Sequence, residues 1–314
     1  MRTSPATRRD VDGIVLLDKP IGLSSNEALQ RVKRLYNARR AGHTGSLDPL
    51  ATGMLPVCLG QATKVSAFLL DADKTYRFRV RFGLRTTTGD LEGEPVATGS
   101  TEVAGPGLRA AAKAMCGPSM QVPPMYSALK HEGRRLYELA RAGLEVARAP
   151  REIRISRLAV EQDESDTATL VVQCSKGTYI RTLAEDLAAR VGTVGHLIEL
   201  RRLSVEPFEE AAMVTLPALE VAASTGQGAL DALLIPMDRA LTHLPLVTLS
   251  GSDAQRIRHG QAISLPGCGI VGLVRLSSAA GGFIGIGEGR SDGQVVPRRL
   301  LAEGPIASAV ESGL

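Results

Sequence analysis

The chain has 314 residues, of which 44% are hydrophobic and 22% are charged, with a formal net charge of +4 and a pI of about 9.0. This length allows one large domain and a second, smaller one. No apolar run approaches the ~20 residues of a membrane span, and the N-terminal MRTSPATRRDVDG lacks the apolar core of a signal peptide, so we expect a cytoplasmic protein without a membrane partner.

Arginine supplies most of the positive charge. Thirty of the 37 cationic residues are arginines, and a guanidinium group matches phosphate oxygens and stacks on bases. A high genomic GC content gives the same enrichment, so the composition leaves nucleic-acid binding open. The four cysteines form no CxxC pair, which argues against a zinc site and a disulfide framework, and we expect no metal.

The first unusual segment in chain order is residues 42–60, GHTGSLDPLATGMLPVCLG. Glycines and Pro49 interrupt it, so we expect neither a helix nor a strand to run through it. Asp48 has no other carboxylate near it in this segment. An aspartate before a proline is typical of a helix N-cap, which predicts one helical turn over residues 48–53. A rigid loop also suits a catalytic carboxylate, and both interpretations stay open.

Residues 75–86, TYRFRVRFGLRT, alternate between apolar and polar side chains. Every second residue from Tyr76 to Leu84 is apolar, and the arginines between them share the opposite face. This pattern predicts a half-buried strand with a cationic outer face. Tyr76 lies on the apolar face, where a core tyrosine is the simpler interpretation.

The rest of the chain predicts further helices and strands and then a small all-β unit. We expect helices over 107–117 and 178–192, and strands over 151–160 and 167–175. Residues 121–151 are proline-led and basic, which indicates a partly helical excursion from the fold. After about residue 245, short apolar strands punctuated by glycine favour a small β-barrel.

Two charged side chains have both structural and functional interpretations. His43 suits a turn or a ligand-binding role, and a structural histidine is the more common case. Arg181 suits a solvated helix face, but it lies at the edge of an apolar stripe that includes Ile180 and Leu183. A partly buried arginine needs an anionic partner, and Asp48 is a candidate.

Several long segments, in order, resemble the TruB family of bacterial tRNA pseudouridine-55 synthases. They are GIVLLDKPIGLSSNEAL (13–29), AGHTGSLDPLATGMLPVCLGQATK (41–64), KTYRFRVRFGLRTTTGD (74–90), CSKGTYIRTLAEDLA (174–188) and LRRLSVEPF (200–208). Residues 121–141 resemble the thumb insertion of that family, and GGFIGIGEG with DGQVVPRRLL resembles its PUA-like RNA-binding domain. The match is looser over residues 188–200, which include Gly195-His196-Leu197.

The resemblance implies an α+β fold. Its central sheet is mixed and mainly antiparallel, is flanked by helices and loops, and is followed by a small PUA-like β-barrel. It also implies a flexible tail over residues 1–12, a catalytic domain over 13–245 with its thumb at about 121–151, and an RNA-binding domain over 246–314.

The resemblance further implies isomerisation of uridine to pseudouridine without a cofactor, by base flipping. Asp48 falls on the catalytic aspartate of the family, as nucleophile or base; its attack on C1′, its addition to the ring and a glycal route remain open. Arg181 falls on its ion-pair partner, which would lower the Asp48 pKa. The remaining implied substrate-binding positions are His43, Tyr76, Tyr179 and Leu200, with Lys19, Lys64, Lys130 and Arg134 as candidate RNA contacts.

The implied partner is tRNA, bound through its TΨC arm and, at the C-terminal domain, its acceptor stem. We expect a monomer without an obligate protein partner. Two rival functions are an RNA chaperone, which could coexist with catalysis, and a glycosidase or nucleoside hydrolase. A hydrolase of that kind usually needs two carboxylates, and the loop has one.

Overall fold

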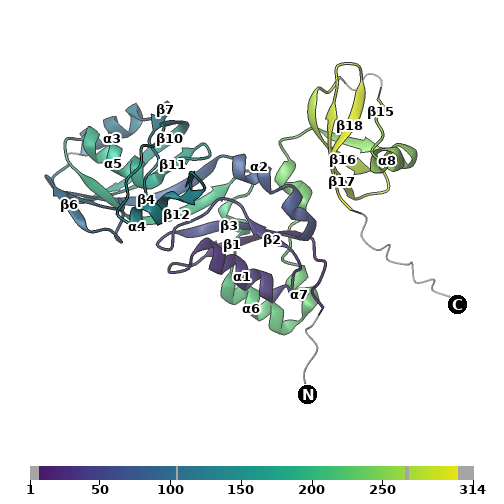
Figure 1. The fold of residues 1–314 in the computed structure, drawn as a ribbon, viewed down its shortest axis with the longest axis horizontal. Coiled ribbons are helices and arrows are strands. Elements are labelled where there is room, and N and C mark those ends of the chain that lie inside the picture. Colours follow the sequence, from purple (N-terminus) through teal and green to yellow (C-terminus); the bar gives the residue numbers. More distant parts are fainter. Residues whose placement is uncertain (1–6, 104, 266–268, 303–314) are drawn as a thin grey trace.

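The computed structural model describes residues 7–103, 105–265 and 269–302. In this part of the chain, a nine-stranded sheet and a five-stranded sheet follow one another (Figure 1). The strands of the large sheet are β1 (Gly13–Lys19), β2 (Ala41–His43), β3 (Thr52–Leu59), β4 (Lys74–Phe82), β7 (Gly117–Gln121), β10 (Arg151–Asp163), β11 (Thr167–Cys174), β12 (Gly195–Val205) and β13 (Val214–Thr215).

The large sheet has the order β13-β1-β3-β12-β4-β11-β10-β7, with β2 paired to β3. The pairs β1–β13 and β3–β12 are parallel, and the other pairs among these described strands are antiparallel. The prediction of a mixed, mainly antiparallel sheet is therefore confirmed. The parallel β3–β12 pair matters for function, because it places the chain just before β3 beside the middle of β12.

Strand β4 has the predicted alternation. Its apolar side chains from Tyr76 to Phe82 are at most 9% exposed, and its arginines lie on the other face. The strand ends at Phe82, earlier than expected, because Gly83 has a φ of +87° and Leu84 begins the separate hairpin β5 (Leu84–Thr86) and β6 (Pro95–Thr98). The outer arginines pair with acidic residues of β10, β12 and the β10–β11 turn, so this face is not a free cationic surface. These pairs are Arg77–Glu161, Arg79–Glu164, Arg79–Glu199 and Arg81–Asp166.

Helices cover the sheet in separate groups. Helices α3 (Gly105–Ala114) and α5 (Ile180–Arg190) pack on β10 and β12, whereas α1 (Ser25–Leu35) and α6 (Leu216–Thr225) pack near β1 and β3. Short helices α2 (Ser66–Asp71) and α7 (Gln227–Asp231) complete the domain. Helix α5 places Ile180, Leu183 and Leu187 in the core, as the apolar stripe predicted.

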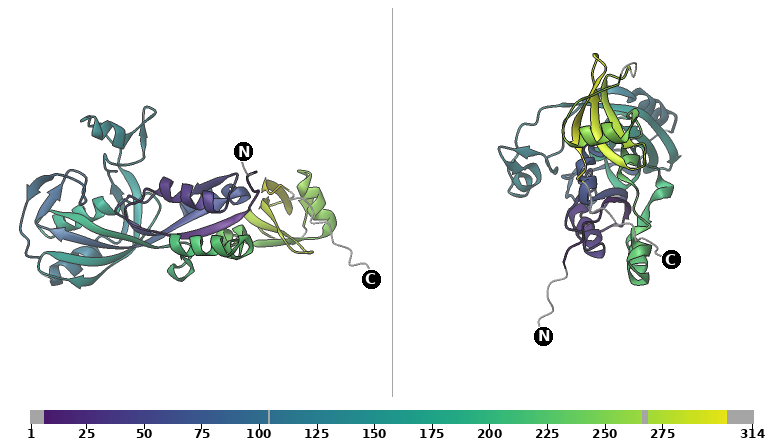
Figure 2. Two further views of the ribbon diagram at one scale, coloured as in Figure 1. Left: turned by 90° about the horizontal axis from the view of Figure 1, so that it is seen from below. Right: turned by 90° about the vertical axis from the view of Figure 1, so that its right-hand side faces the viewer.

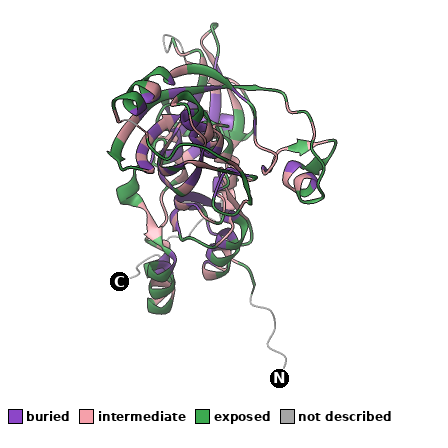
Figure 3. Ribbon diagram, turned by 90° about the vertical axis from the view of Figure 1, so that its left-hand side faces the viewer, coloured by how far each residue is buried: buried purple, intermediate pink, exposed green. Residues whose placement is uncertain are grey.

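The segment between β7 and β10 leaves the sheet and returns to the neighbouring strand. It contains a two-stranded hairpin, β8 (Lys130–His131) and β9 (Arg134–Arg135), and helix α4 (Leu136–Arg141). We call residues 122–150 the thumb. It stands away from the body of the molecule in Figure 2, and most of it is exposed or intermediate in Figure 3, with Leu136 and Leu139 as the buried residues of α4.

The second sheet begins at Leu246 and has the order β14-β16-β17-β18-β15, with α8 (Gly251–Arg258) beside it. Its strands are β14 (Leu246–Leu249), β15 (Ile263–Ser264), β16 (Gly272–Ser278), β17 (Phe283–Gly289) and β18 (Gln294–Leu300). The predicted small PUA-like β-barrel is confirmed in the form of a curled half-barrel, whose edge strands are β14 and β15. Ile286 belongs to a core cluster that also contains Leu69 and Leu241 of the first domain, so the two domains share packed apolar contacts.

The expected flexible tail over residues 1–12 stays a prediction, but two of its described residues contact the rest of the domain. Arg9 donates two hydrogen bonds to the carboxylate of Asp231, and the Asp12 carboxylate accepts from the backbone N–H of Gln61 at 2.7 Å. Arg9 and Asp12 are therefore tied to the body of the domain. Residues 1–6 lie outside the described part of the chain.

Candidate active site

The loop that carries Asp48 joins β2 to β3 and is fixed from several sides. Ser25, at the start of α1, donates from Oγ to the carbonyl of Leu47 at 2.9 Å and accepts from the Leu47 N–H at 2.7 Å. The carbonyl of Pro49 accepts from Gly22 N–H at 2.8 Å. Asp48 is therefore held on a rigid loop, as a catalytic side chain needs to be.

The structure has no helix over residues 48–53. The Asp48 carbonyl accepts from Ala51 N–H at 3.0 Å, which closes one tight four-residue turn, and β3 begins directly after it at Thr52. Gly53 is thus not a helix end but a strand residue with a φ of +97°. A Cβ added there would lie 2.2 Å from the carbonyl oxygen of Arg202, so this glycine permits the close approach of β3 and β12.

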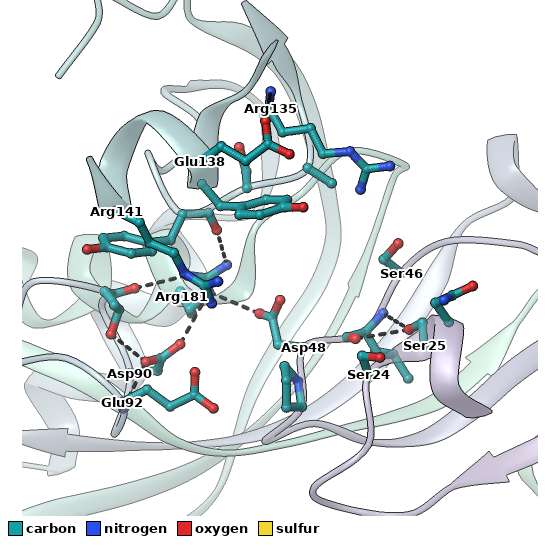
Figure 4. Close-up of a pocket in the computed structure, with 18 of the residues that line it drawn as sticks. Ser24, Ser25, Ser46, Asp48, Asp90, Glu92, Arg135, Glu138, Arg141 and Arg181 are labelled. Carbon is teal, nitrogen blue, oxygen red and sulfur yellow. Dashed lines mark hydrogen bonds and ion pairs between the residues drawn. The ribbon is translucent and has the colours of Figure 1, made fainter. Parts of the chain in front are cut away.

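Arg181, in the first turn of α5, forms an ion pair with Asp48. Its Nε lies 3.1 Å from Oδ2 of Asp48 and 3.7 Å from Oδ2 of Asp90. Its other nitrogens donate to the carbonyls of Thr88, at 3.1 Å, and Tyr126, at 2.6 Å. Four fixed acceptors therefore hold a guanidinium that is only 6% exposed, and Figure 4 shows it between the two carboxylates.

Burial and the ion pair act in opposite directions on Asp48. Burial on the protein side raises the pKa of its carboxyl group, Arg181 lowers it and Asp90 raises it; the net result is a raised pKa. We expected a lowered pKa from Arg181 alone. That expectation omitted the protein atoms that remove water from part of the Asp48 carboxyl group. The rest of the side chain, 41% of its surface, stays exposed.

Two cavities meet at Asp48 and Arg181, which line both. A cleft of about 980 Å³ lies between the thumb and the Asp48 loop, with His43 and Tyr137 in its wall. A smaller pocket of about 410 Å³ adjoins it. Figure 4 shows the thumb residue Arg141 on one side of Asp48 and the start of α1 on the other.

The predicted binding residues divide between the two cavities. Tyr76, Tyr179 and Leu200 line the smaller pocket together with Asp48. Tyr76 and Leu200 are 9% and 8% exposed, whereas Tyr179 is half-buried. His43 lines the larger cleft, where its Nδ1 has no hydrogen-bond partner in the described part of the chain, and burial lowers its pKa.

The four candidate RNA contacts differ in accessibility. Lys130 and Arg134 are exposed on the thumb hairpin, and Lys130 also lines the cleft. Lys19 is fully buried; its Nζ donates to the carbonyls of Pro20 and Leu23, so its interpretation as a phosphate contact is wrong. Burial lowers the Lys19 pKa to about 8.

Lys64 also has a structural partner. Its Nζ donates to the carbonyl of Leu300 at 2.8 Å, and its own carbonyl accepts from Arg299 at 2.8 Å. This lysine therefore joins the C-terminal sheet to the first domain. It is already engaged at that interface, and its interpretation as an RNA contact stays a prediction.

The structure adds residues to the site that the sequence reasoning missed. Asp90 shares Arg181 with Asp48 and is 3% exposed. Arg202 is 1% exposed and donates to the carbonyls of Met54, at 2.6 Å, and Gly45, at 2.9 Å. Both residues lie inside the resembling segments 74–90 and 200–208, which was the available signal.

A third missed residue, Gln121, fixes Tyr179. Its side-chain amide donates to the Tyr179 carbonyl at 3.1 Å and accepts from the Tyr179 N–H at 2.8 Å. Gln121 is the last residue before the thumb, so it links the root of the thumb to the pocket wall. The described residues contain no cluster of His, Cys, Asp or Glu that could hold a metal ion, and no described helix is long and apolar enough to cross a membrane.

Family models match almost the whole chain. The N-terminal domain of TruB family pseudouridylate synthase matches residues 33–180, the C-terminal domain of tRNA pseudouridylate synthase B matches 181–242, and the C-terminal model of pseudouridine synthase II TruB matches 245–301. The three models follow one another along the chain in that order.

Similar proteins match this chain over most of their own length. The chain is 51% identical to tRNA pseudouridine synthase B of Methylobacillus flagellatus, over 94% of this chain and 97% of that protein. It is 52% identical to tRNA pseudouridine synthase B of Stutzerimonas stutzeri, with the same coverage.

Solved structures extend the likeness to the fold. A chain in the crystal structure of a Cbf5-Nop10-Gar1 complex is 26% identical with a TM-score of 0.72, and the match covers 92% of this chain and 84% of that one. A chain in the crystal structure of the archaeal box H/ACA sRNP Nop10-Cbf5 complex is 25% identical with a TM-score of 0.70. That match covers 92% of this chain and 85% of the other. The chain therefore belongs to the TruB family of pseudouridylate synthases and is an isomerase.

Proposed function

We propose that this enzyme converts uridine 55 in the TΨC arm of tRNA to pseudouridine. The observation that carries the proposal is the Asp48–Arg181 ion pair, which lies where an open cleft meets a smaller, partly apolar pocket. Its relatives named tRNA pseudouridine synthase B support tRNA as the substrate. A carboxylate at the junction is suited to act on the bond between a ribose in the cleft and a base in the pocket.

The dimensions of the cavities support base flipping. A base inside a folded RNA loop has to leave its stack before its glycosidic bond can react. The pocket of about 410 Å³ is large enough for one everted uracil, with Tyr76 as a stacking wall and Leu200 as an apolar one; such a ring–base stack is worth roughly 1–3 kcal/mol. His43, in the cleft wall, would fill the gap that the everted base leaves.

The reaction is a rearrangement in which nothing is oxidised and no group is added. The C1′–N1 bond breaks, the uracil turns, a C1′–C5 bond forms, the C5 proton leaves and N1 takes up a proton. Asp48 acts in its ionised form, as nucleophile at C1′ or the ring or as base at C2′, and Arg181 stabilises that ionised form. A base has to accept the C5 proton, and burial raises the pKa of Tyr76, which disfavours a Tyr76 phenolate in that role and leaves stacking as its main contribution.

Replacement of Asp48 tests the proposal directly. The change Asp48→Asn keeps the size of the side chain and removes its charge, so we expect tRNA binding to persist while tritium release from C5-labelled uridine falls below detection. Mapping of pseudouridines in tRNA from a deletion strain, with and without this gene, identifies the position. Full turnover by Asp48→Asn would remove the basis of the mechanism, and modification at another uridine would remove the specificity.

The accompanying proposals concern partners and location. We propose that the C-terminal sheet contacts the acceptor stem through its shape and backbone charge, and that the protein acts as a cytoplasmic monomer. A tRNA-folding role would depend on binding surfaces such as Lys130 and Arg134, which are exposed on the thumb and distant in sequence from Asp48. Folding assistance that survives Asp48→Asn would support that second role.

Asp90 does not fit the second carboxylate that the hydrolase alternative needs. Its usual second carboxylate would have to reach the substrate. Asp90 is near enough to share Arg181, but its side chain is only 4% exposed. It is held by Thr88 Oγ1 and by the backbone N–H of Glu92. This carboxylate is therefore placed to position Arg181 and not to activate water.

A further inference from the structure

A third cavity lies beside the smaller pocket and has no role in the chemistry described so far. It is a groove of about 560 Å³ between β10, the end of α2 and the turn after β11. Its lining residues are Leu70, Arg151, Glu152, Ile153, Arg154, Ser175, Lys176 and Gly177. Leu70, Ser175 and Gly177 also line the pocket, so the two cavities adjoin each other.

The arginines of this groove differ from those on the outer face of the same sheet. Arg77, Arg79 and Arg81 each pair with an acidic residue. Arg151 and Arg154 are exposed and form no ion pair within the described part of the chain. The first set of cations has acidic partners within the chain, whereas the second set has none in the described residues and is available to an external anion.

The groove is rigid at its base. Two reciprocal hydrogen bonds join Arg154 to Ser175. The Arg154 N–H donates to Ser175 Oγ at 2.9 Å, and the Ser175 N–H donates to the Arg154 carbonyl at 2.9 Å. A Cβ added at Gly177 would meet open space, so the turn leaves room for a bound group.

Lys176 adds a third cation, and two acids reduce the total charge. Its Nζ lies 2.8 Å from Asp71 Oδ1, but both side chains are more than half exposed, at 60% and 64%. An exposed pair of this kind contributes only about 0–1 kcal/mol, so Lys176 can exchange its partner for a phosphate. Glu152 opposes the two arginines and leaves a modest positive excess.

The lining also limits the kind of ligand. No aromatic side chain lines the groove, so it offers no platform on which a base could stack. Guanidinium groups bind phosphate oxygens in bidentate fashion. We propose that this groove binds backbone phosphates of the substrate RNA beside the everted nucleotide. The inference rests on the proposed function, because it assumes that the nucleotide enters the adjoining pocket.

The test compares the double change Arg151→Gln with Arg154→Gln against the single change Arg157→Gln. Arg157 is exposed on the same strand, has no ion pair in the described part of the chain and lies outside the groove. The dissociation constant of a TΨC stem–loop RNA is measured against salt concentration for each protein. Steady-state kinetics are measured on the same RNA.

We expect the affinity of the double variant for the stem–loop RNA to depend less steeply on salt concentration. Its slope of log K against log salt should fall in magnitude by roughly 1–2, as for two lost phosphate contacts. KM should rise about five- to tenfold near physiological salt with kcat unchanged, because the contact is remote from the reacting bond. Arg157→Gln should change neither quantity, and all three proteins should have the same Tm.

Each contrary result has a distinct meaning. A wild-type protein that neither binds nor converts the stem–loop would overturn the proposed function itself. A double variant with the slope and KM of the wild type, in a wild type that converts the RNA, would overturn the groove alone. An equal loss of affinity for an unrelated RNA hairpin would also overturn it, because the arginines would then act only as a general positive charge.

Discussion

The two sides of the central sheet use arginine in opposite ways. On the side of the active site, Arg181 and Arg202 are 6% and 1% exposed and are held by carbonyl oxygens of the backbone. On the outer side, the guanidinium-bearing side chains of Arg77, Arg79 and Arg81 are 50%, 30% and 49% exposed and meet side-chain carboxylates. The same residue type is fixed in one place and loosely paired in the other.

This difference shows which charges determine the geometry of the site. A buried cation without acceptors costs several kcal/mol, so the chain has to supply partners in fixed positions. The partners of Arg181 come from the β5–β6 hairpin, the Asp48 loop and the root of the thumb. One guanidinium therefore holds three separate segments together. Exposed pairs are screened by water and salt and impose little on the backbone.

The largest effect is expected at Arg181. The change Arg181→Met removes the partner of Asp48 and leaves the carbonyls of Thr88 and Tyr126 without their donors. Misplacement of a reacting group by about 1 Å can cost about 10²-fold in rate, so we expect kcat/KM for pseudouridine formation to fall by at least that factor. Tritium release from C5-labelled RNA measures it.

The same variant has a signature in its pH dependence. Because Arg181 lowers the Asp48 pKa and Asp90 raises it, removal of the guanidinium should move the acid limb of kcat/KM to higher pH. The matched control is Arg181→Lys, which keeps a positive charge but cannot make all the hydrogen bonds of the guanidinium group. The acid limb of kcat/KM should shift less in this variant, although kcat/KM also falls. An unmoved limb in Arg181→Met would show that Asp48 does not act as the ionised group.

The next effect, on stability, is expected at Arg202. The change Arg202→Met keeps the length of the side chain but leaves the carbonyls of Met54 and Gly45 unsatisfied in the interior. Each such group costs about 1–3 kcal/mol, so the free energy of unfolding should fall by roughly 2–4 kcal/mol. Urea denaturation followed by circular dichroism measures it. A loss below about 1 kcal/mol would mean that the two carbonyls find other donors.

The fold was predictable where the pattern is local. The alternation over β4 and the apolar stripe of α5 each follow from residues within one element, and both were found. A lone acid in a glycine-rich segment singled out Asp48, but the residues alone left a helix cap and a catalytic carboxylate open, and its catalytic role came from the family resemblance. The predicted helical turn was wrong because Gly53 lies in a strand and permits the close approach of β12, which lies about 150 residues further along the sequence.

Burial was the part of the site that the sequence did not show. Lys19 and Lys64 look like exposed cations in a one-dimensional pattern, but backbone carbonyls take up their ammonium groups. Asp90 and Arg202 were missed for the converse reason, since their partners come from distant segments. A lysine or an aspartate reveals its role only when the packing around it is known.

The smallest effect is expected on the outer face of the sheet. Arg77→Gln removes one member of the pair with Glu161, whose side chains are 50% and 42% exposed. Exposed pairs contribute a median of about 0–1 kcal/mol, so the free energy of unfolding should change by less than ~0.5 kcal/mol. Affinity for tRNA should also stay constant, because Glu161 already neutralises this arginine. A several-fold loss of affinity, measured by filter binding at ~0.15 M salt, would instead make the outer face an RNA-binding surface, and the division between the two sides of the sheet would no longer hold.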